Sequence, residues 1–175
     1  MKASKTFISD LIILEPHVYS DNRGEFYEFY NKKKYVDLGI DDNFVQDNHS
    51  LSCKGTIRGL HFQIEPKAQS KLIRVVDGEI YDVVVDLRLN SPTYLKWFGI
   101  ILSSINNKIL YIPKGFAHGF YVLSEKAAIN YKCNNFYSVE HERTLHWQDP
   151  ELNIQWPLYK NIPVIISEKD NAAGF

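Results

Sequence analysis

Gly55-Thr56-Ile57-Arg58-Gly59-Leu60-His61-Phe62-Gln63 is the stretch that decides the fold, and Pro113-Lys114-Gly115-Phe116-Ala117-His118 is its counterpart further along the chain. The first stretch has the spacing G-x5-H-x-H, except that Gln63 stands in the place of the second histidine, and the second has the spacing P-x-G-x-x-H. Together they supply two imidazoles, whereas a transition metal is normally held by three or more protein ligands. We therefore predict a site for proton transfer rather than a metal centre.

The rest of the chain predicts one all-β domain over residues 1–175, a length that allows a sizeable core. Short apolar and aromatic runs follow one another, with turn signals such as Asp77-Gly78 and Asn106-Asn107 between them, as is typical of a sandwich or barrel. The expected strands cover residues 25–30, 44–52, 71–76, 79–87, 97–102, 108–112, 117–123 and 127–133. One helix is expected at 32–38, ended by Gly39, and an irregular tail from Asp149.

Charge and composition exclude several classes of protein. The net charge is −1 with acidic and basic residues interleaved, so no nucleic-acid surface is expected. The first 13 residues hold no apolar stretch long enough for a signal peptide or a membrane span. Cys53 and Cys133 lie far apart in sequence, and we expect reduced thiols in a cytoplasmic protein.

Residues 78–88 have apolar side chains on both faces of a strand, which predicts a strand covered on both sides. Asp82 and Asp86 would then be buried, and they would need partners because an unpaired buried charge is costly. Arg74 and Arg88 are the candidates. We favour internal ion pairs over a catalytic role for these carboxylates.

Six motifs in order resemble the dTDP-4-dehydrorhamnose 3,5-epimerases, which are metal-free cupins. These motifs are residues 44–50, 57–63, 71–75, 85–88, 112–120 and 131–132. The resemblance covers about residues 14–170 and implies a cupin double-stranded β-helix, that is, a jelly-roll barrel with short peripheral helices. It also implies a homodimer without a cofactor. The implied reaction is epimerisation at C3 and C5 of dTDP-4-dehydro-6-deoxyglucose to dTDP-4-dehydro-6-deoxy-L-mannose, a step of dTDP-rhamnose synthesis.

The resemblance also implies the catalytic residues. A 4-keto group acidifies the hydrogens on both neighbouring carbons, so a base can form an enolate and an acid can return a proton on the opposite face. His61 matches the base and Asp170 the carboxylate that orients it. Lys71 and Arg58 would stabilise the enolate oxygen. Tyr131 matches the acid, although a phenol with an ordinary pKa near 10 is a poor one.

Arg58 and His61 raise a geometric question, because residues three apart in a regular strand point to opposite faces. The proposed site needs both of them in one pocket. We predict a bulge or twist at Gly59 that re-aims one of the two side chains.

Substrate-binding residues implied by the resemblance share charged, amide or aromatic side chains. They are Arg23, Phe26, Glu28, Gln46, Asn48, Arg58, His118, Tyr137, Glu142 and Lys169. Arginine suits a diphosphate because its planar group donates in pairs. Phe26 and Tyr137 are candidates for stacking on thymine, with packing in the core or in a dimer interface as the alternative.

Other functions on the same scaffold stay open. One is an epimerase that acts only at C3 or C5 of another nucleotide 4-keto-6-deoxy sugar, and another is a 3,4-ketoisomerase, against which Tyr131 argues. A non-catalytic sugar-binding cupin is disfavoured, because such a protein has no use for a base, an acid and a cation together. The sequence leaves open the nucleotide base and the end product of the pathway.

Overall fold

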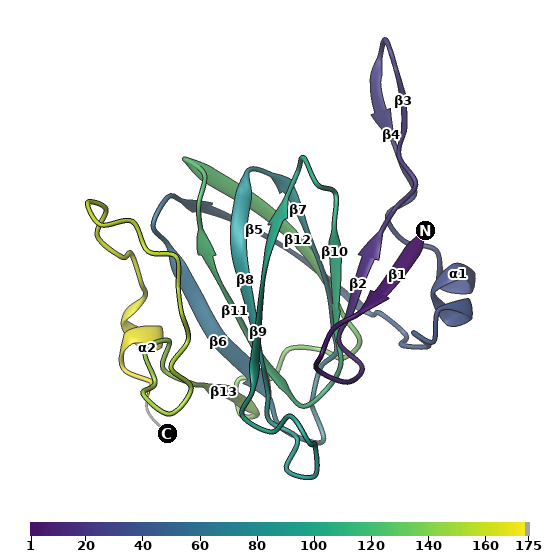
Figure 1. The fold of residues 1–175 in the computed structure, drawn as a ribbon. Coiled ribbons are helices and arrows are strands. Elements are labelled where there is room, and N and C mark those ends of the chain that lie inside the picture. The colour runs from purple at the N-terminus through teal and green to yellow at the C-terminus, as the bar shows by residue number, and fades with distance from the viewer. Residues whose placement is uncertain (174–175) are drawn as a thin grey trace.

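The computed structural model describes residues 1–173, which form two antiparallel β-sheets facing one another, with two short helices outside them (Figure 1). This confirms the predicted all-β fold with short peripheral helices. No helix within residues 1–173 has the length and apolar character needed to cross a membrane.

The first sheet has six strands in the order β1-β2-β10-β7-β12-β5. Their bounds are β1 Lys2–Lys5, β2 Ile12–Glu15, β5 Gln46–Cys53, β7 Lys71–Asp77, β10 Ile109–Ile112 and β12 Lys126–Cys133. The second sheet has five strands in the order β13-β6-β11-β8-β9. Their bounds are β6 Ile57–Gln63, β8 Glu79–Asp86, β9 Trp97–Ser103, β11 Phe116–Val122 and β13 Glu142–Thr144.

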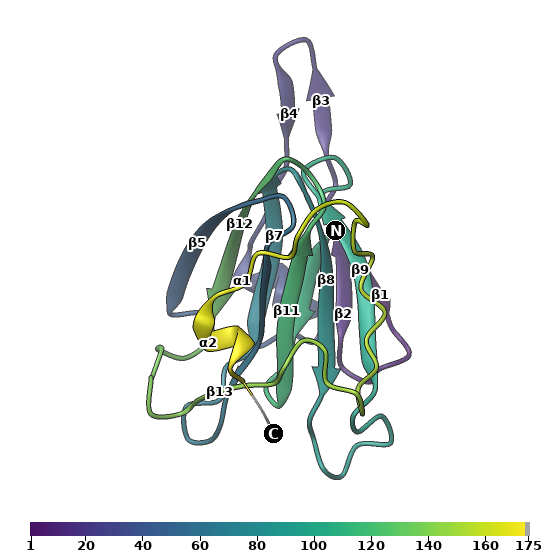
Figure 2. The same ribbon diagram turned by 90° about the vertical axis from the view of Figure 1, so that its left-hand side faces the viewer.

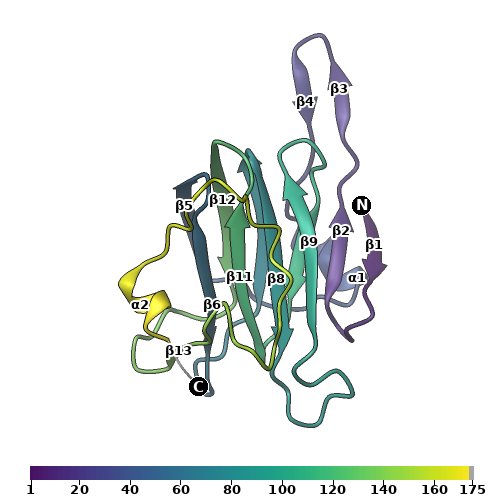
Figure 3. The ribbon, with the colours of Figure 1, turned by 60° about the vertical axis from the view of Figure 1, so that its left-hand side comes forward.

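A separate hairpin consists of β3 (Tyr19–Asp21) and β4 (Gly24–Phe26). It projects beyond the ends of the sandwich strands, away from β13 and from α2 (Glu168–Asn171), as the views in Figures 1, 2 and 3 agree. The other helix, α1 (Lys32–Asp37), begins at Asn31, whose side chain accepts a hydrogen bond from the Lys34 backbone N–H.

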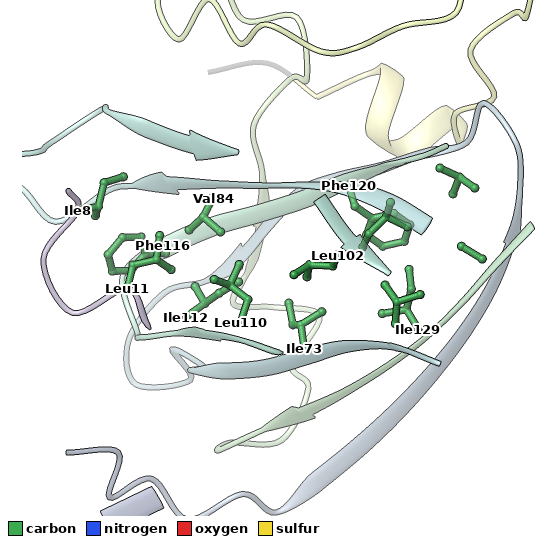
Figure 4. Close-up of a cluster of buried hydrophobic side chains, with 14 residues drawn as sticks. Ile8, Leu11, Ile73, Val84, Leu102, Leu110, Ile112, Phe116, Phe120 and Ile129 are labelled. Atoms are coloured by element: carbon green, nitrogen blue, oxygen red, sulfur yellow. The ribbon is translucent and has the colours of Figure 1, made fainter. Parts of the chain in front are cut away.

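The main core fills the space between the two sheets (Figure 4). In β8, Ile80 and Val84 point into this core, whereas Val83 and Val85 pack on the other face of the sheet against Leu152 from the C-terminal segment. This confirms that β8 is covered on both sides. Apolar burial on both faces of one central strand stabilises the sheet that carries the site residues.

The strands expected between residues 44 and 133 and the helix at 32–38 are confirmed within two residues at each end. The strand expected at 25–30 is wrong, because β4 ends at Phe26. Phe29 and Tyr30 instead pack against a cluster that includes Tyr35 of α1 and Ile40. The sequence did not predict β1, β2, β3 or β13, nor α2 within the tail that it described as irregular.

Candidate active site

A cavity of about 280 Å³ lies between the two sheets. One wall comes from β6 and β13 of the five-stranded sheet, and the other from β5, β7 and β12 of the six-stranded sheet. The residues that line it are Gln46, Asn48, His61, Phe62, Gln63, Gln69, Lys71, Tyr131, Cys133, Tyr137 and Glu142.

The His61 side chain is held in this cavity by a hydrogen-bonded carboxylate, Asp170. Its Nε2 lies 2.7 Å from Oδ1 of Asp170, and the other oxygen of that carboxylate accepts the backbone N–H of Gly59 at 3.1 Å. Ser167 caps α2 by accepting the Asp170 N–H at 3.1 Å, so the helix fixes the position of the carboxylate. When one ring nitrogen of a histidine bonds to a buried carboxylate, the orientation of the ring is fixed and the imidazolium form is stabilised. Both effects help the other ring nitrogen to act as a general base.

The charge of Asp170 follows from its surroundings. Only 4% of this residue is exposed, and burial by itself would raise the pKa of the carboxyl. The bonds from His61 and Gly59 outweigh burial and lower that pKa, so the group stays ionised at neutral pH. An ionised Asp170 stabilises the imidazolium that forms when His61 accepts a proton.

Gly59 solves the geometric problem raised by the spacing of Arg58 and His61. In the pairing of β6 with β11, His61 faces His118 and Arg58 faces Phe120, so three steps along β6 match two along β11. Because His118 and Phe120 lie on one face of β11, their partners also share a face. The predicted irregularity at Gly59, which has φ +119°, is confirmed.

Arg58 itself reaches toward β5, where its Nε donates to Oγ of Ser52 at 2.9 Å. The guanidinium does not line the cavity, but its positive charge acts on Tyr131. Burial raises the pKa of Tyr131, and the Arg58 charge offsets part of that rise.

Lys71 and Tyr131 enter the cavity from the six-stranded sheet, opposite His61. Burial lowers the pKa of the Lys71 ammonium, although Cys133, Asp82 and Glu142 act in the opposite direction. The cavity thus has a cation and a phenol on one wall and an imidazole on the other.

His118 is a neighbour of the cavity rather than part of its lining. Its Nε2 lies 2.8 Å from Oδ2 of Asp82, which is fully buried. Burial raises the pKa of the Asp82 carboxyl and lowers that of His118, so both shifts favour the uncharged pair.

The expected arginine partners of the two buried aspartates are right in one case and wrong in the other. Arg88 binds Asp86 through its Nε and Nη2, both at 2.9 Å, as an internal ion pair. Arg74 binds neither carboxylate, because its guanidinium lies over the ring of Phe29 on the outer face of the sheet. Asp82 pairs with His118 instead.

The outer rim of the cavity carries a chain of polar contacts. The Tyr137 hydroxyl donates to Glu142 Oε2 at 2.8 Å, and Lys169 Nζ donates to the same oxygen at 2.5 Å. The Tyr137 N–H donates to Gln46 Oε1 at 2.9 Å, and Gln46 in turn donates to Asn48 at 3.0 Å. Five of the expected substrate-binding residues therefore lie together.

Arg23, Phe26 and Glu28 do not lie with them. Arg23 pairs with Asp21 inside the projecting hairpin, and Phe26 is 71% exposed there. Glu28 binds Lys34 of α1. Within one chain these three residues lie outside the cavity.

Phe62, Gln63, Gln69 and Cys133 line the cavity but were not among the expected site residues. The alternation of side chains along β6 placed Gln63 on the face of His61, so its position could have been predicted. The same alternation along β12 put Cys133 on the face of Tyr131. Gln69 lies outside the strands and gave no comparable signal. Among residues 1–173, no three His, Cys, Asp or Glu side chains gather as a metal site would need.

Comparisons with known proteins show which family the chain is similar to. A family model described as dTDP-4-dehydrorhamnose 3,5-epimerase matches residues 5–175. The dTDP-4-dehydrorhamnose 3,5-epimerase of Shigella flexneri is 51% identical over 97% of this chain and 93% of its own. The crystal structure of dTDP-6-deoxy-D-glucose-3,5-epimerase from Legionella pneumophila, in complex with dTDP-4-keto-L-rhamnose, is 50% identical. It matches with a TM-score of 0.95 over 99% of this chain and 91% of that one.

A more distant relative with the same fold is described as an epimerase of a single centre. A 3′-monoepimerase from Streptomyces bikiniensis, in complex with dTDP-quinovose, is 30% identical with a TM-score of 0.89. The match covers 97% of this chain and 85% of that one. The level of identity to the first two relatives and the nearly complete coverage are decisive. This chain belongs to the dTDP-4-dehydrorhamnose 3,5-epimerase family.

Proposed function

We propose that this protein is a dTDP-4-dehydrorhamnose 3,5-epimerase, which converts dTDP-4-dehydro-6-deoxyglucose to dTDP-4-dehydro-6-deoxy-L-mannose. One observation carries the proposal. A carboxylate-supported histidine, His61, enters the cavity from one sheet, and a phenol, Tyr131, enters it from the other. Inversion of a carbon centre needs a base and an acid on opposite faces of the substrate, and this arrangement supplies both.

The reaction follows from these groups. His61 removes the proton next to the keto group, and the electrons of the broken C–H bond pass to the keto oxygen as an enolate. Asp170 stabilises the imidazolium that results, and Lys71 stabilises the enolate oxygen. Tyr131 then donates its proton to the opposite face of the same carbon. His61 loses its proton to solvent and Tyr131 regains one, which resets the site for the second centre.

The nucleotide would lie along the polar rim. The amides of Gln46 and Asn48, the exposed ring of Tyr137, and the Glu142–Lys169 pair offer donors, acceptors and a stacking surface. His118 faces His61 in the pairing of β6 with β11, and the Arg58 charge acts on Tyr131, so we place both residues beside the sugar.

We also propose a homodimer in which the projecting hairpin completes the partner's site. Arg23 and Phe26 sit on a two-stranded hairpin that carries exposed aromatic surface away from its own cavity. An isolated hairpin of this kind is marginally stable without a surface to pack on. If Arg23, Phe26 and the nearby Glu28 bind substrate, they do so across a subunit contact.

A cytoplasmic location fits the free thiols of Cys53 and Cys133.

A solvent-exchange experiment tests the proposed reaction. The protein is incubated with dTDP-4-dehydro-6-deoxyglucose in deuterated water, and deuterium at C3 and C5 is counted by NMR. We expect deuterium at both carbons. Label at one carbon would show a single-centre epimerase, as in the Streptomyces bikiniensis relative, and no label would refute both.

A further inference from the structure

Gln63 stands where the G-x5-H-x-H spacing would have its second histidine, and its side chain binds backbone groups of two loops. It is 7% exposed at the end of β6. Its Nε2 donates to the carbonyl oxygens of Lys67 at 2.5 Å and Phe136 at 3.3 Å, and its Oε1 accepts the N–H of Ser138 at 2.7 Å. Both amide hydrogens and the carbonyl of this side chain are therefore in use.

These three bonds join two loops that lie apart in sequence. Lys67 belongs to the loop between β6 and β7, whereas Phe136 and Ser138 belong to the loop between β12 and β13. The second loop carries Tyr137, and Gln63 binds the residue on each side of it. One buried amide thus fixes the backbone on both sides of the tyrosine at the cavity rim.

Tyr137 depends on such anchors. The residue is 55% exposed, so apolar packing contributes little to the position of its ring. Apart from the Gln63 bonds beside it, its contacts are its N–H to Gln46 and its hydroxyl to Glu142. Both of those partners also lie on the rim.

We propose that Gln63 is a positioning residue, which pre-organises the loop bearing Tyr137 for the nucleotide part of the substrate. Gln63 makes no hydrogen bond to His61, Lys71 or Tyr131, so it acts on binding and leaves the proton transfers alone. A loop held in its bound position costs less to order when the ligand arrives. The kinetic part of this inference rests on the proposed reaction, and the dTDP part rests on the proposed nucleotide site at the rim, whereas the effect of Gln63 on the loop depends on neither.

Gln63→Met tests the proposal, because methionine has a similar size but neither donates nor accepts as the amide does. We expect amide hydrogen exchange in residues 134–141 to become faster, and the Kd for dTDP, measured by calorimetry, to rise by about tenfold for the loss of pre-organised bonds. KM should rise in parallel, and kcat should stay within about threefold. Gln155→Met, at an exposed glutamine with bonds only to Asn153, is the matched control and should change none of these.

Gln63→Asn keeps the amide but withdraws it by one methylene, so it cannot reach both loops, and it carries the test if the methionine variant does not fold. Unchanged exchange and dTDP affinity in a folded variant would overturn the proposal. So would a loss of kcat with normal dTDP affinity, since Gln63 would then act on the chemistry. If the wild-type protein binds dTDP but turns over no 4-keto sugar, the proposed reaction fails while exchange and affinity still test Gln63.

Discussion

At the scale of single residues, His61 and Tyr131 have different neighbours, and the difference matches their proposed roles as base and acid. His61 has a dedicated carboxylate 2.7 Å away, whereas the phenol of Tyr131 has burial, which raises its pKa, and the nearby charge of Arg58, which lowers it. Because its pKa is raised, Tyr131 stays protonated at neutral pH and has a proton to give to the enolate, which is a far stronger base than a phenolate. The same rise makes the phenol a weaker acid, and the Arg58 charge offsets part of that effect.

Paired variants separate the two roles. His61→Asn should lower both hydrogen exchange and epimerisation by roughly a hundred to ten thousand fold, the usual contribution of a general base. Tyr131→Phe should still exchange substrate hydrogens with deuterated water but should lose net inversion, because removal and return of a proton on the His61 face remain intact. NMR follows both processes in one sample. His146→Asn, outside the cavity, is the control.

Two results would contradict this assignment. One is Tyr131→Phe protein that epimerises at the normal rate. The other is Tyr131→Phe protein that loses exchange together with inversion while it still binds dTDP, since the phenol would then be needed for the first step.

Sequence reasoning identified cavity residues better than their partners. Motif spacing singled out His61, and the resemblance grouped it with Lys71 and Tyr131 in one site; all three line the same cavity. Asp170 lies 109 residues from His61, and only the resemblance pointed to it. The partner of Asp82 was missed because charge suggests arginines, whereas the contact depends on how β11 lies beside β8.

At the scale of elements, β6 depends on the close approach of Gly59 to β11. A Cβ at Gly59 would lie 2.6 Å from Cα of Gly119 and 2.7 Å from the carbonyl oxygen of His118. These are backbone atoms, which cannot rotate away as a side chain would. The bulge that aligns Arg58 with His61 therefore needs glycine for both its φ and its space.

Gly59→Ala measures that requirement, and Gly39→Ala is the matched control. Gly39 also has a positive φ, +85°, but no atom lies within 4 Å of its added Cβ. Both variants carry the conformational cost of a left-handed alanine, and Gly59→Ala should lose about 1–3 kcal/mol more of the free energy of unfolding through overpacking. Urea denaturation gives this difference. Gly59→Ala should also lose exchange activity, whereas equal stability losses in the two variants would show that the contact relaxes freely.

Local sequence patterns predicted some strands correctly and failed for the aromatic run at 25–30. The strands between residues 44 and 133 were predicted well because Val- and Ile-rich runs are separated by glycine and asparagine turns. The run at 25–30 consists of Glu, Phe and Tyr, and its aromatic residues are also common in strands, but Phe29 and Tyr30 pack against the α1 region instead of extending the hairpin. Composition alone does not distinguish a strand from a segment that packs against a helix, because aromatic residues are suited to both.

At the scale of the whole molecule, the projecting hairpin is the feature that one chain does not explain. The hairpin of β3 and β4 projects beyond the sandwich strands and away from β13, which contributes to the cavity, and its Phe26 is 71% exposed. In a two-fold dimer each hairpin would serve the other subunit's cavity, so each site would contain residues from both chains. The resemblance implied that Arg23 and Phe26 bind substrate but did not indicate to which subunit's substrate they bind.

Complementation between two inactive variants decides the matter. One variant is His61→Asn with a normal hairpin, and the other is the double substitution Arg23→Ala and Phe26→Ala with a normal His61; each alone should be nearly inactive. In a mixed dimer, a hairpin that acts in trans gives one site with both an intact base and an intact hairpin. Random exchange of subunits from equal amounts should therefore restore about a quarter of the wild-type activity per chain. A hairpin that acts on its own chain leaves every site with a defect, so a co-expressed and purified mixture without activity would refute the shared site.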